Sequence, residues 1–147
     1  MEDEDRRRGK IEDELPEYTT EFVVGSEDVN QRYNVFEAGR ALTHVNNNVA
    51  ELIARRRGFE SYERMISDNQ TQVMYYGTDR SRFIRRSSEG DRLTITSKFI
   101  GQNDKGNIVA ESKIYFTGEE KNVVYIQSSQ HTIVNARTGE RTPRSEI

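Results

Sequence analysis

The feature that most constrains the fold is a single strongly amphipathic segment in the first half of the chain. Apolar side chains recur there at helical spacing and fall within one narrow sector at about 100° per residue. They are Ala38, Leu42, Val45, Val49, Leu52 and Ile53. This spacing predicts a helix from about Asn34 or Ala38 to Arg57, with Gly58 where the helix is expected to stop. Such a helix needs a partner surface for its apolar face.

The remainder of the chain carries mainly β-strand signals. Alternating and β-branched runs predict a strand near residues 19–24 and four more after the helix, separated by turn sequences rich in Gly, Asn and Asp. The later candidates are residues 71–77, continued or bulged into 81–86, and then 93–100, 108–116 and 123–134. A weaker signal indicates a short helix within residues 59–68. Short connections between strands imply an antiparallel sheet, and one helix to cover it makes the fold class α+β.

Length and composition indicate one domain preceded by a short extension. A chain of 147 residues can build one substantial core. The hydrophobic fraction is only 33% and the charged fraction 32%, but the charge is concentrated at the start, where acidic and basic residues alternate without apolar periodicity. We therefore predict a flexible charged extension over residues 1–17 and a single domain over residues 18–147.

Charge and residue usage exclude several classes of function. A net charge of -3 argues against a nucleic-acid partner, which would need a concentrated basic surface. The absence of cysteine excludes disulfides and thiolate chemistry and suits a cytoplasmic location. With only two histidines we expect no metal site, and no apolar run is long enough for a membrane span.

Three short motifs carry a resemblance to a known family. Residues 88–95 read Ser-Glu-Gly-Asp-Arg-Leu-Thr-Ile, residues 106–112 read Gly-Asn-Ile-Val-Ala-Glu-Ser, and residues 137–143 read Arg-Thr-Gly-Glu-Arg-Thr-Pro. In this order and at this spacing they resemble strand starts and the C-terminal segment of hotdog-fold thioesterases. The resemblance covers about residues 18–143. It implies a long central helix wrapped by a curved antiparallel sheet of five or six strands.

Within this superfamily the chain leans towards thioesterases that act on acyl-CoA or acyl-carrier-protein substrates. Residues 34–45 are similar to the central helix of the plant and bacterial acyl-carrier-protein thioesterases. The resemblance implies that the partner is an acyl thioester small molecule or an acyl carrier protein. Coenzyme A or phosphopantetheine would enter only as part of the substrate, with no separate cofactor. It also implies a homodimer or a dimer of dimers, which would cover the exposed edge of the sheet.

A second alignment places residues 27–36 on the loop before the helix in the hydroxybenzoyl-CoA and enediyne-polyketide types. The position of the catalytic Asp of the hydroxybenzoyl-CoA type is then Asn30. An asparagine cannot act as a general base. By this alignment only the enediyne type, which is similar in having Asn there, would retain chemistry.

Candidate site residues follow from what thioester hydrolysis requires. One carboxylate, or a carboxamide that positions water, must lie beside backbone N–H groups that polarise the thioester carbonyl. Glu37 is the preferred base with His44 as its partner, and Asn30 is the carboxamide candidate. Asn48 and Glu51, on the same helix flank, and Arg82, in a strand, are candidates for substrate binding. The alternative is that these are ordinary polar residues at the boundary of the core.

Two other functions remain open. The chain would be a non-catalytic acyl-binding or oligomerisation protein if the missing loop Asp abolishes chemistry. A hotdog dehydratase is the third possibility. It is disfavoured because those proteins typically pair a His with an acid in or near one loop, whereas His44 falls on the predicted helix.

Overall fold

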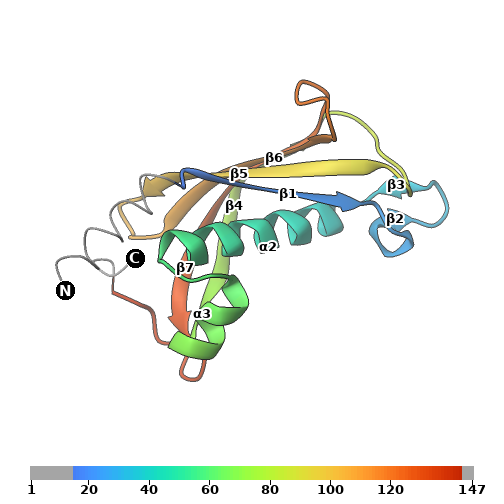
Figure 1. Cartoon of the computed structure of the whole chain (residues 1–147). Coiled ribbons are helices and arrows are strands. Elements are labelled where there is room, and N and C mark those ends of the chain that lie inside the picture. Colours follow the sequence, from blue (N-terminus) through green and yellow to red (C-terminus); the bar gives the residue numbers. More distant parts are fainter. Residues whose placement is uncertain (1–14, 144–147) are drawn as a thin grey trace.

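The computed structural model describes residues 15–143, in which one long helix lies across an antiparallel sheet (Figure 1). The strands of this sheet are β1 (Glu17–Val23), β4 (Thr71–Phe83), β5 (Arg92–Gln102), β6 (Ile108–Phe116) and β7 (Val123–Asn135). The long helix is α2 (Ala38–Arg56), followed by the short helix α3 (Tyr62–Asn69). Between β1 and α2 lie a single 3-10 turn, η1 (Ser26–Asp28), and the two-residue strands β2 (Val29–Asn30) and β3 (Val35–Phe36).

The five long strands have the order β1-β5-β6-β7-β4, and every neighbouring pair is antiparallel. Strand β4, predicted as two runs or one bulged run, is a single strand with register shifts between Tyr75 and Gly77 and between Thr78 and Arg80. These irregularities let a long edge strand follow the curvature of the sheet. The predicted α+β class and the hotdog arrangement are confirmed.

Helix α2 begins at Ala38, the later of the two predicted starts. Asn34 has a φ of 51°, in the left-handed region, and cannot belong to the helix. At the other end Gly58 adopts a φ of 92°, and its N–H donates to the carbonyl of Arg55. A left-handed glycine at this position terminates the helix because it suffers no Cβ clash there.

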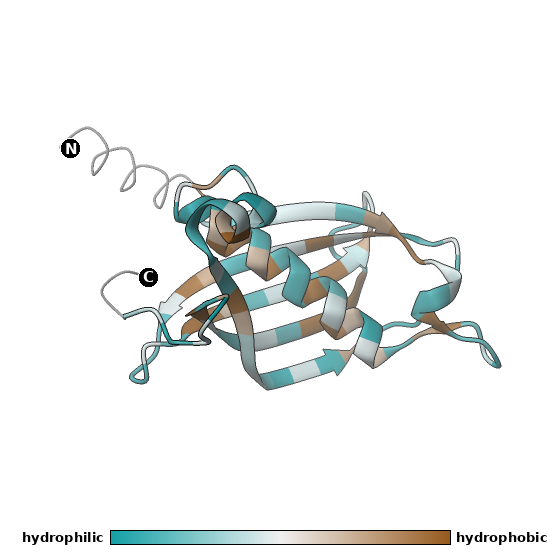
Figure 2. Cartoon of the chain, turned by 90° about the horizontal axis from the view of Figure 1, so that it is seen from below, coloured by the Kyte–Doolittle hydropathy of each residue, from teal (hydrophilic) through white to brown (hydrophobic). Residues whose placement is uncertain are grey.

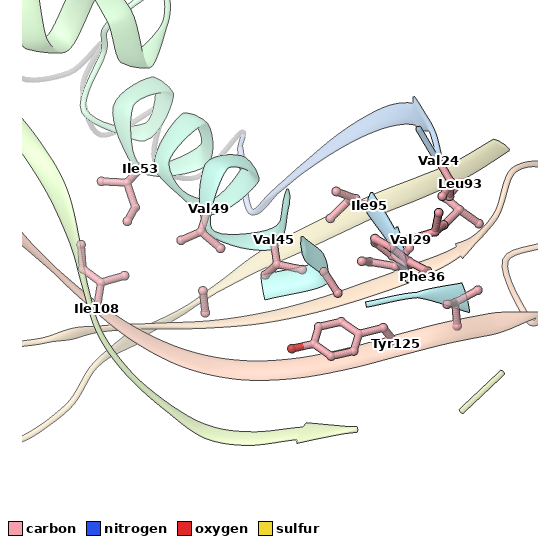
Figure 3. Close-up of a cluster of buried hydrophobic side chains, with 14 of the residues drawn as sticks. Val24, Val29, Phe36, Val45, Val49, Ile53, Leu93, Ile95, Ile108 and Tyr125 are labelled. Carbon is pink, nitrogen blue, oxygen red and sulfur yellow. The ribbon is translucent and has the colours of Figure 1, made fainter. Parts of the chain in front are cut away.

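The apolar face of α2 packs onto the concave face of the sheet. Val45, Val49 and Leu52 have no exposed surface, as their spacing predicted. Figure 3 shows Val45, Val49 and Ile53 pointing towards the strands, in the same cluster as Ile95 and Ile108. The predicted apolar sector is wrong at its first member, because Ala38 is exposed at the start of the helix. Seen from the helix side, the strands spread out behind α2 and carry apolar residues beneath it (Figure 2).

The predicted N-terminal extension lies almost entirely outside the described residues. Of that segment, Glu17 already belongs to β1 and pairs with Lys98. The two residues before it also contact the domain: the carbonyl of Leu15 accepts a hydrogen bond from Arg56, and that of Pro16 accepts one from the N–H of Phe99.

Candidate functional site

The loop between β1 and α2 is held in place by Asp28, which is 1% exposed. Its Oδ2 accepts a hydrogen bond from the N–H of Gly25 at 2.9 Å, which closes the η1 turn. Its backbone carbonyl accepts the N–H of Glu37 at 3.0 Å. Asp28 therefore connects the start of the loop to the residue that precedes α2.

The other carboxylate oxygen of Asp28 faces two basic side chains of α2. Arg40 Nε and His44 Nε2 each lie 2.9 Å from Oδ1. Burial alone would raise the pKa of Asp28, but the bonds from Gly25, His44 and Arg40 outweigh it and hold the pKa below its ordinary value. Asp28 is thus a buried, ionised anchor with its acceptor sites in use.

The imidazole of His44 is positioned by this contact and by stacking. Its ring lies 4.1 Å from that of Phe22, with an angle of 18° between the planes. His44 does not pair with Glu37 as predicted, because its Nε2 contacts Asp28 Oδ1 instead. His44 therefore belongs to the anchor of the loop.

Asn30 has its carboxamide oriented by the β2–β3 turn. Its Oδ1 accepts hydrogen bonds from the N–H groups of Arg32, at 2.9 Å, and Tyr33, at 3.2 Å. This Asx turn uses the acceptor end of the side chain. The amino group of Asn30 has no hydrogen-bond partner among the described residues and is left as a donor.

Asn30 and Glu37 line the same open groove at the N-terminal end of α2. The groove has a volume of about 690 Å³, and Ala38 and Gly39 form part of its wall. The backbone N–H groups of the first helical turn have no acceptor within the helix, and no side chain caps them here. The structure thus brings together an exposed carboxylate, a carboxamide donor and helix N–H groups. The carboxamide donor and the helix N–H groups favour partial negative charge on a bound atom, and the carboxylate can accept a proton.

The other three predicted site residues lie elsewhere. Asn48 is 4% exposed and bonds to Thr20, Ser97 and the carbonyl of Tyr18, connecting α2 to two strands. Glu51 accepts the N–H of Tyr62 and lies 3.5 Å from Arg55. Arg82 is exposed on β4, opposite Ile126. None of the three lines the groove.

Asp28 was not among the predicted site residues, and the second alignment placed it only within the loop formed by residues 27–36. A signal was present. Gly25 and Asp28 are three residues apart, the spacing of a turn closed by its own side chain, and Arg40 and His44 are four apart, on one face of a helix. Nothing in the sequence, however, stated that the two pairs meet.

Two further observations concern the described part of the chain. No helix within residues 15–143 is long and apolar enough to cross a membrane. Within the same range, no three His, Asp or Glu side chains are grouped as a metal ion would require.

Comparison with known proteins finds similarity only at the level of structure. No family model matches the sequence, and no curated protein matches it. Among solved structures, a 1,4-dihydroxy-2-naphthoyl-CoA thioesterase from Synechocystis superposes with a TM-score of 0.65 at 16% identity, over 86% of this chain and 88% of that one. A DHNA-CoA thioesterase from Staphylococcus aureus superposes with a TM-score of 0.67 at 12% identity, over 86% of this chain and 79% of that one.

A third structure, a hypothetical protein from Staphylococcus aureus in complex with CoA, gives a TM-score of 0.65 at 16% identity. It is matched over 88% of this chain and 78% of its own. At such low identity the likeness concerns the course of the backbone and not the site residues. The chain therefore has the hotdog fold, the fold of these thioesterases.

Proposed function

We propose that the protein is an acyl thioester hydrolase acting on acyl-CoA or acyl-carrier-protein substrates. The observation that carries this proposal is the groove in which Asn30 and Glu37 lie beside the first N–H groups of α2. The proposal is supported by the thioesterases among the solved structures with the same fold.

In this proposal the thioester carbonyl lies at the start of α2. The N–H groups of Ala38 and Gly39 and the amino group of Asn30 donate to its oxygen as negative charge develops there. Glu37 accepts a proton from water, whose oxygen attacks the carbonyl carbon. The C–S bond then breaks, and the thiolate takes the proton back from Glu37, giving a carboxylic acid and a free thiol.

The Asp28 anchor has a positioning role in this scheme. Asp28 fixes the loop that carries Asn30 and accepts the N–H of Glu37, so both groups keep a defined place relative to α2. The carboxylate of Asp28 is too deeply buried to contact substrate.

The test is a thioester hydrolysis panel across acyl chain lengths, with the parent protein, Glu37→Gln and Asn30→Ala. Glu37→Gln removes the base but keeps the shape of the side chain, and we expect turnover to fall at least tenfold, about 1.4 kcal/mol of barrier. Asn30→Ala is expected to lower turnover by a similar factor. Glu37 is exposed, so Glu37→Gln should leave the free energy of unfolding within about 1 kcal/mol of the parent value. Asn30→Ala also removes the acceptor of two hydrogen bonds in the Asx turn and is expected to cost about 1–2 kcal/mol.

Glu63→Gln is the matched control, since Glu63 is an exposed carboxylate in α3 that does not line the groove. Unchanged turnover in folded Glu37→Gln would exclude Glu37 as the base. A parent protein inactive on the whole panel would instead favour the non-catalytic acyl-binding alternative.

One observation favours a second candidate, the hydratase or dehydratase. The 2.9 Å contact between His44 and Asp28 provides the pair of His and acid that the sequence had not placed together. Against it, the acid is buried and engaged by Arg40 and Gly25 as well. Adding a 2-enoyl thioester to the panel distinguishes the two reactions, because hydration removes the conjugated double bond while the thioester stays intact.

We also propose a homodimer formed through β4. This strand is an edge of the five-stranded sheet, thirteen residues long, and exposes Met74, Tyr75 and Tyr76 by 46%, 38% and 53%. An edge strand with exposed apolar side chains and unpaired backbone groups is a template for a second strand, and a symmetric copy of the same edge pairs with it antiparallel.

Light scattering should therefore give a mass near twice 17.1 kDa at micromolar concentration. The double variant Met74→Lys with Tyr76→Lys should be a folded monomer, because a charged edge opposes strand pairing. Val23→Lys, on the opposite edge strand and 57% exposed in the parent, should remain dimeric. A monomeric parent protein contradicts the proposal.

A further inference from the structure

The groove at the start of α2 continues into a second cavity. Four residues line both: Val35, Phe36, Ala38 and Arg86. The second cavity, of about 350 Å³, extends along Phe83, Ile84 and Arg85, at and just beyond the end of β4. One continuous channel therefore leads from Asn30 and Glu37 to the segment that follows β4.

The chemical character of this channel changes along its length. Its beginning is polar, with Asn30, Glu37 and the start of α2. Its middle is apolar, formed by Val35 and by Phe36, whose ring meets that of Phe83 edge-on at 6.1 Å. Arg86 lies where the two cavities meet, and Arg85 makes the second cavity cationic beyond that point.

The two arginines of the channel are available for a ligand. Both are exposed, and within residues 15–143 neither guanidinium has a hydrogen-bonding or ion-pair partner. Of the two, Arg86 lines both cavities, whereas Arg85 lines only the second of them. Most other arginines near the helix are engaged, as Arg40 is by Asp28.

A buried hydroxyl lies next to Arg86. Ser87 is 2% exposed, and its Oγ has no hydrogen-bond partner among the described residues. Its carbonyl accepts the N–H of Phe36, which places Ser87 directly behind the channel wall. A buried hydroxyl without a partner is costly, and Ser87 itself lines neither cavity, so this unused hydrogen-bonding group lies behind the wall and not on its surface.

We propose that Arg86 binds the phosphate of a phosphopantetheine-type thioester and so determines specificity for phosphorylated carriers. This inference rests on the proposed function. The pantetheine arm has a reactive thioester at one end, an apolar and amide-containing middle, and a phosphate at the other end. The channel offers matching groups: Asn30 and Glu37 in the first cavity, Val35 and Phe36 along both cavities, and a cationic surface at Arg86 that continues to Arg85. A planar guanidinium binds phosphate through paired charge-assisted hydrogen bonds.

The decisive experiment compares two ligands that differ only by the phosphate. Phosphopantetheine and pantetheine are titrated by calorimetry into the full-length protein and into Arg86→Ala. We expect the parent protein to bind phosphopantetheine at least tenfold more tightly than pantetheine, and Arg86→Ala to abolish this difference while binding pantetheine as before. Arg86→Lys should restore only part of it, because an ammonium cannot make the paired contact.

Arg137→Ala is the control for the loss of one positive charge. Arg137 is exposed in the turn after β7, which Figure 1 shows beside α3, at the other end of α2 from the β2–β3 hairpin. This variant should keep the preference for phosphopantetheine. If Arg86→Ala and Arg137→Ala lose the preference for phosphopantetheine to the same extent, the effect is one of net charge and the proposal is overturned. A parent protein that binds phosphopantetheine and pantetheine equally would also overturn it.

Kinetics separate this inference from the proposed function. With octanoyl thioesters, Arg86→Ala should raise KM for octanoyl-phosphopantetheine at least tenfold at constant kcat and leave KM for octanoyl-pantetheine unchanged. A parent protein that hydrolyses neither but retains the binding preference would refute the hydrolase proposal and support the phosphate site. If the parent protein and every variant hydrolyse the two octanoyl thioesters with equal KM values, the hydrolase proposal is supported and the phosphate site is refuted.

The carrier is identified by Arg85→Ala. If CoA is the carrier, this variant should weaken CoA binding more than phosphopantetheine binding, because CoA bears further phosphates beyond the pantetheine arm. If an acyl carrier protein is the carrier, CoA and phosphopantetheine should bind the parent protein equally. Whichever carrier is used, Arg86→Ala should lose the contact with the phosphate that CoA and phosphopantetheine share. If Arg86→Ala binds CoA and phosphopantetheine with full affinity, Arg86 is not the phosphate-binding residue.

Discussion

Val49→Asp is expected to prevent folding. Val49 has no exposed surface and lies at the centre of the contact between α2 and the concave face of the sheet (Figure 3). A carboxylate there would have no partner, because the neighbouring core positions are apolar: Val45, Ile53, Ile95 and Ile108. Such a buried charge costs more than about 4 kcal/mol, a large part of the stability of a small domain. Circular dichroism and denaturant titration measure the loss.

Asn47→Asp is the matched control, because Asn47 is exposed on the same helix and the change introduces the same carboxylate. It should change the free energy of unfolding by less than about 0.5 kcal/mol. A folded Val49→Asp protein of parental stability would mean that α2 does not pack through this face, and the placement of the groove at its N-terminus would then lose its basis.

The second large effect concerns pH. His131, on β7, is 1% exposed, and burial lowers its pKa from 6.5 to about 4. Its Nε2 lies 2.8 Å from Ser129 Oγ, and Tyr75 lies edge-on to its ring at 6.0 Å. The unfolded chain therefore binds a proton at pH values where the folded chain does not. Above about pH 6.5 the free energy of unfolding should contain the full contribution of neutral His131. It should fall by about 3 kcal/mol as the pH drops to 4, and His131 should cause no further change below that pH.

The measurement is the free energy of unfolding from pH 8 to pH 4 for the parent protein and His131→Gln. Glutamine can still bond to Ser129 but does not titrate, so the variant should lose most of the decline between pH 6.5 and 4. Asp28 acts in a separate range: its lowered pKa gives stability that is lost only as the pH falls below its ordinary value of 3.8. Identical pH profiles for the parent protein and His131→Gln would show that protonated His131 is tolerated in the fold.

Local sequence patterns were sufficient to predict the elements of this fold. The helix, its end at Gly58 and the long strands follow from periodicity of 3.6 or 2 residues and from turn residues, which act over a few neighbouring positions. The α+β class follows because one helix has to cover one antiparallel sheet. Of the candidate site, the chemistry of Glu37 and Asn30 could be proposed from residue type and from their place before the helix.

Only the tertiary structure decided which polar groups meet. Asn48 and His44 lie on the same predicted flank, yet Asn48 contacts Ser97 of β5 while His44 contacts Asp28 of the loop. Arg86 is 49 residues from Glu37 in sequence and lines the same groove. Side-chain contacts at such separations depend on how α2 lies across the sheet and where β4 ends, and no local pattern encodes this. The sequence determined the elements and the kind of chemistry available, and the packing of the helix on the sheet decided which residues form the site.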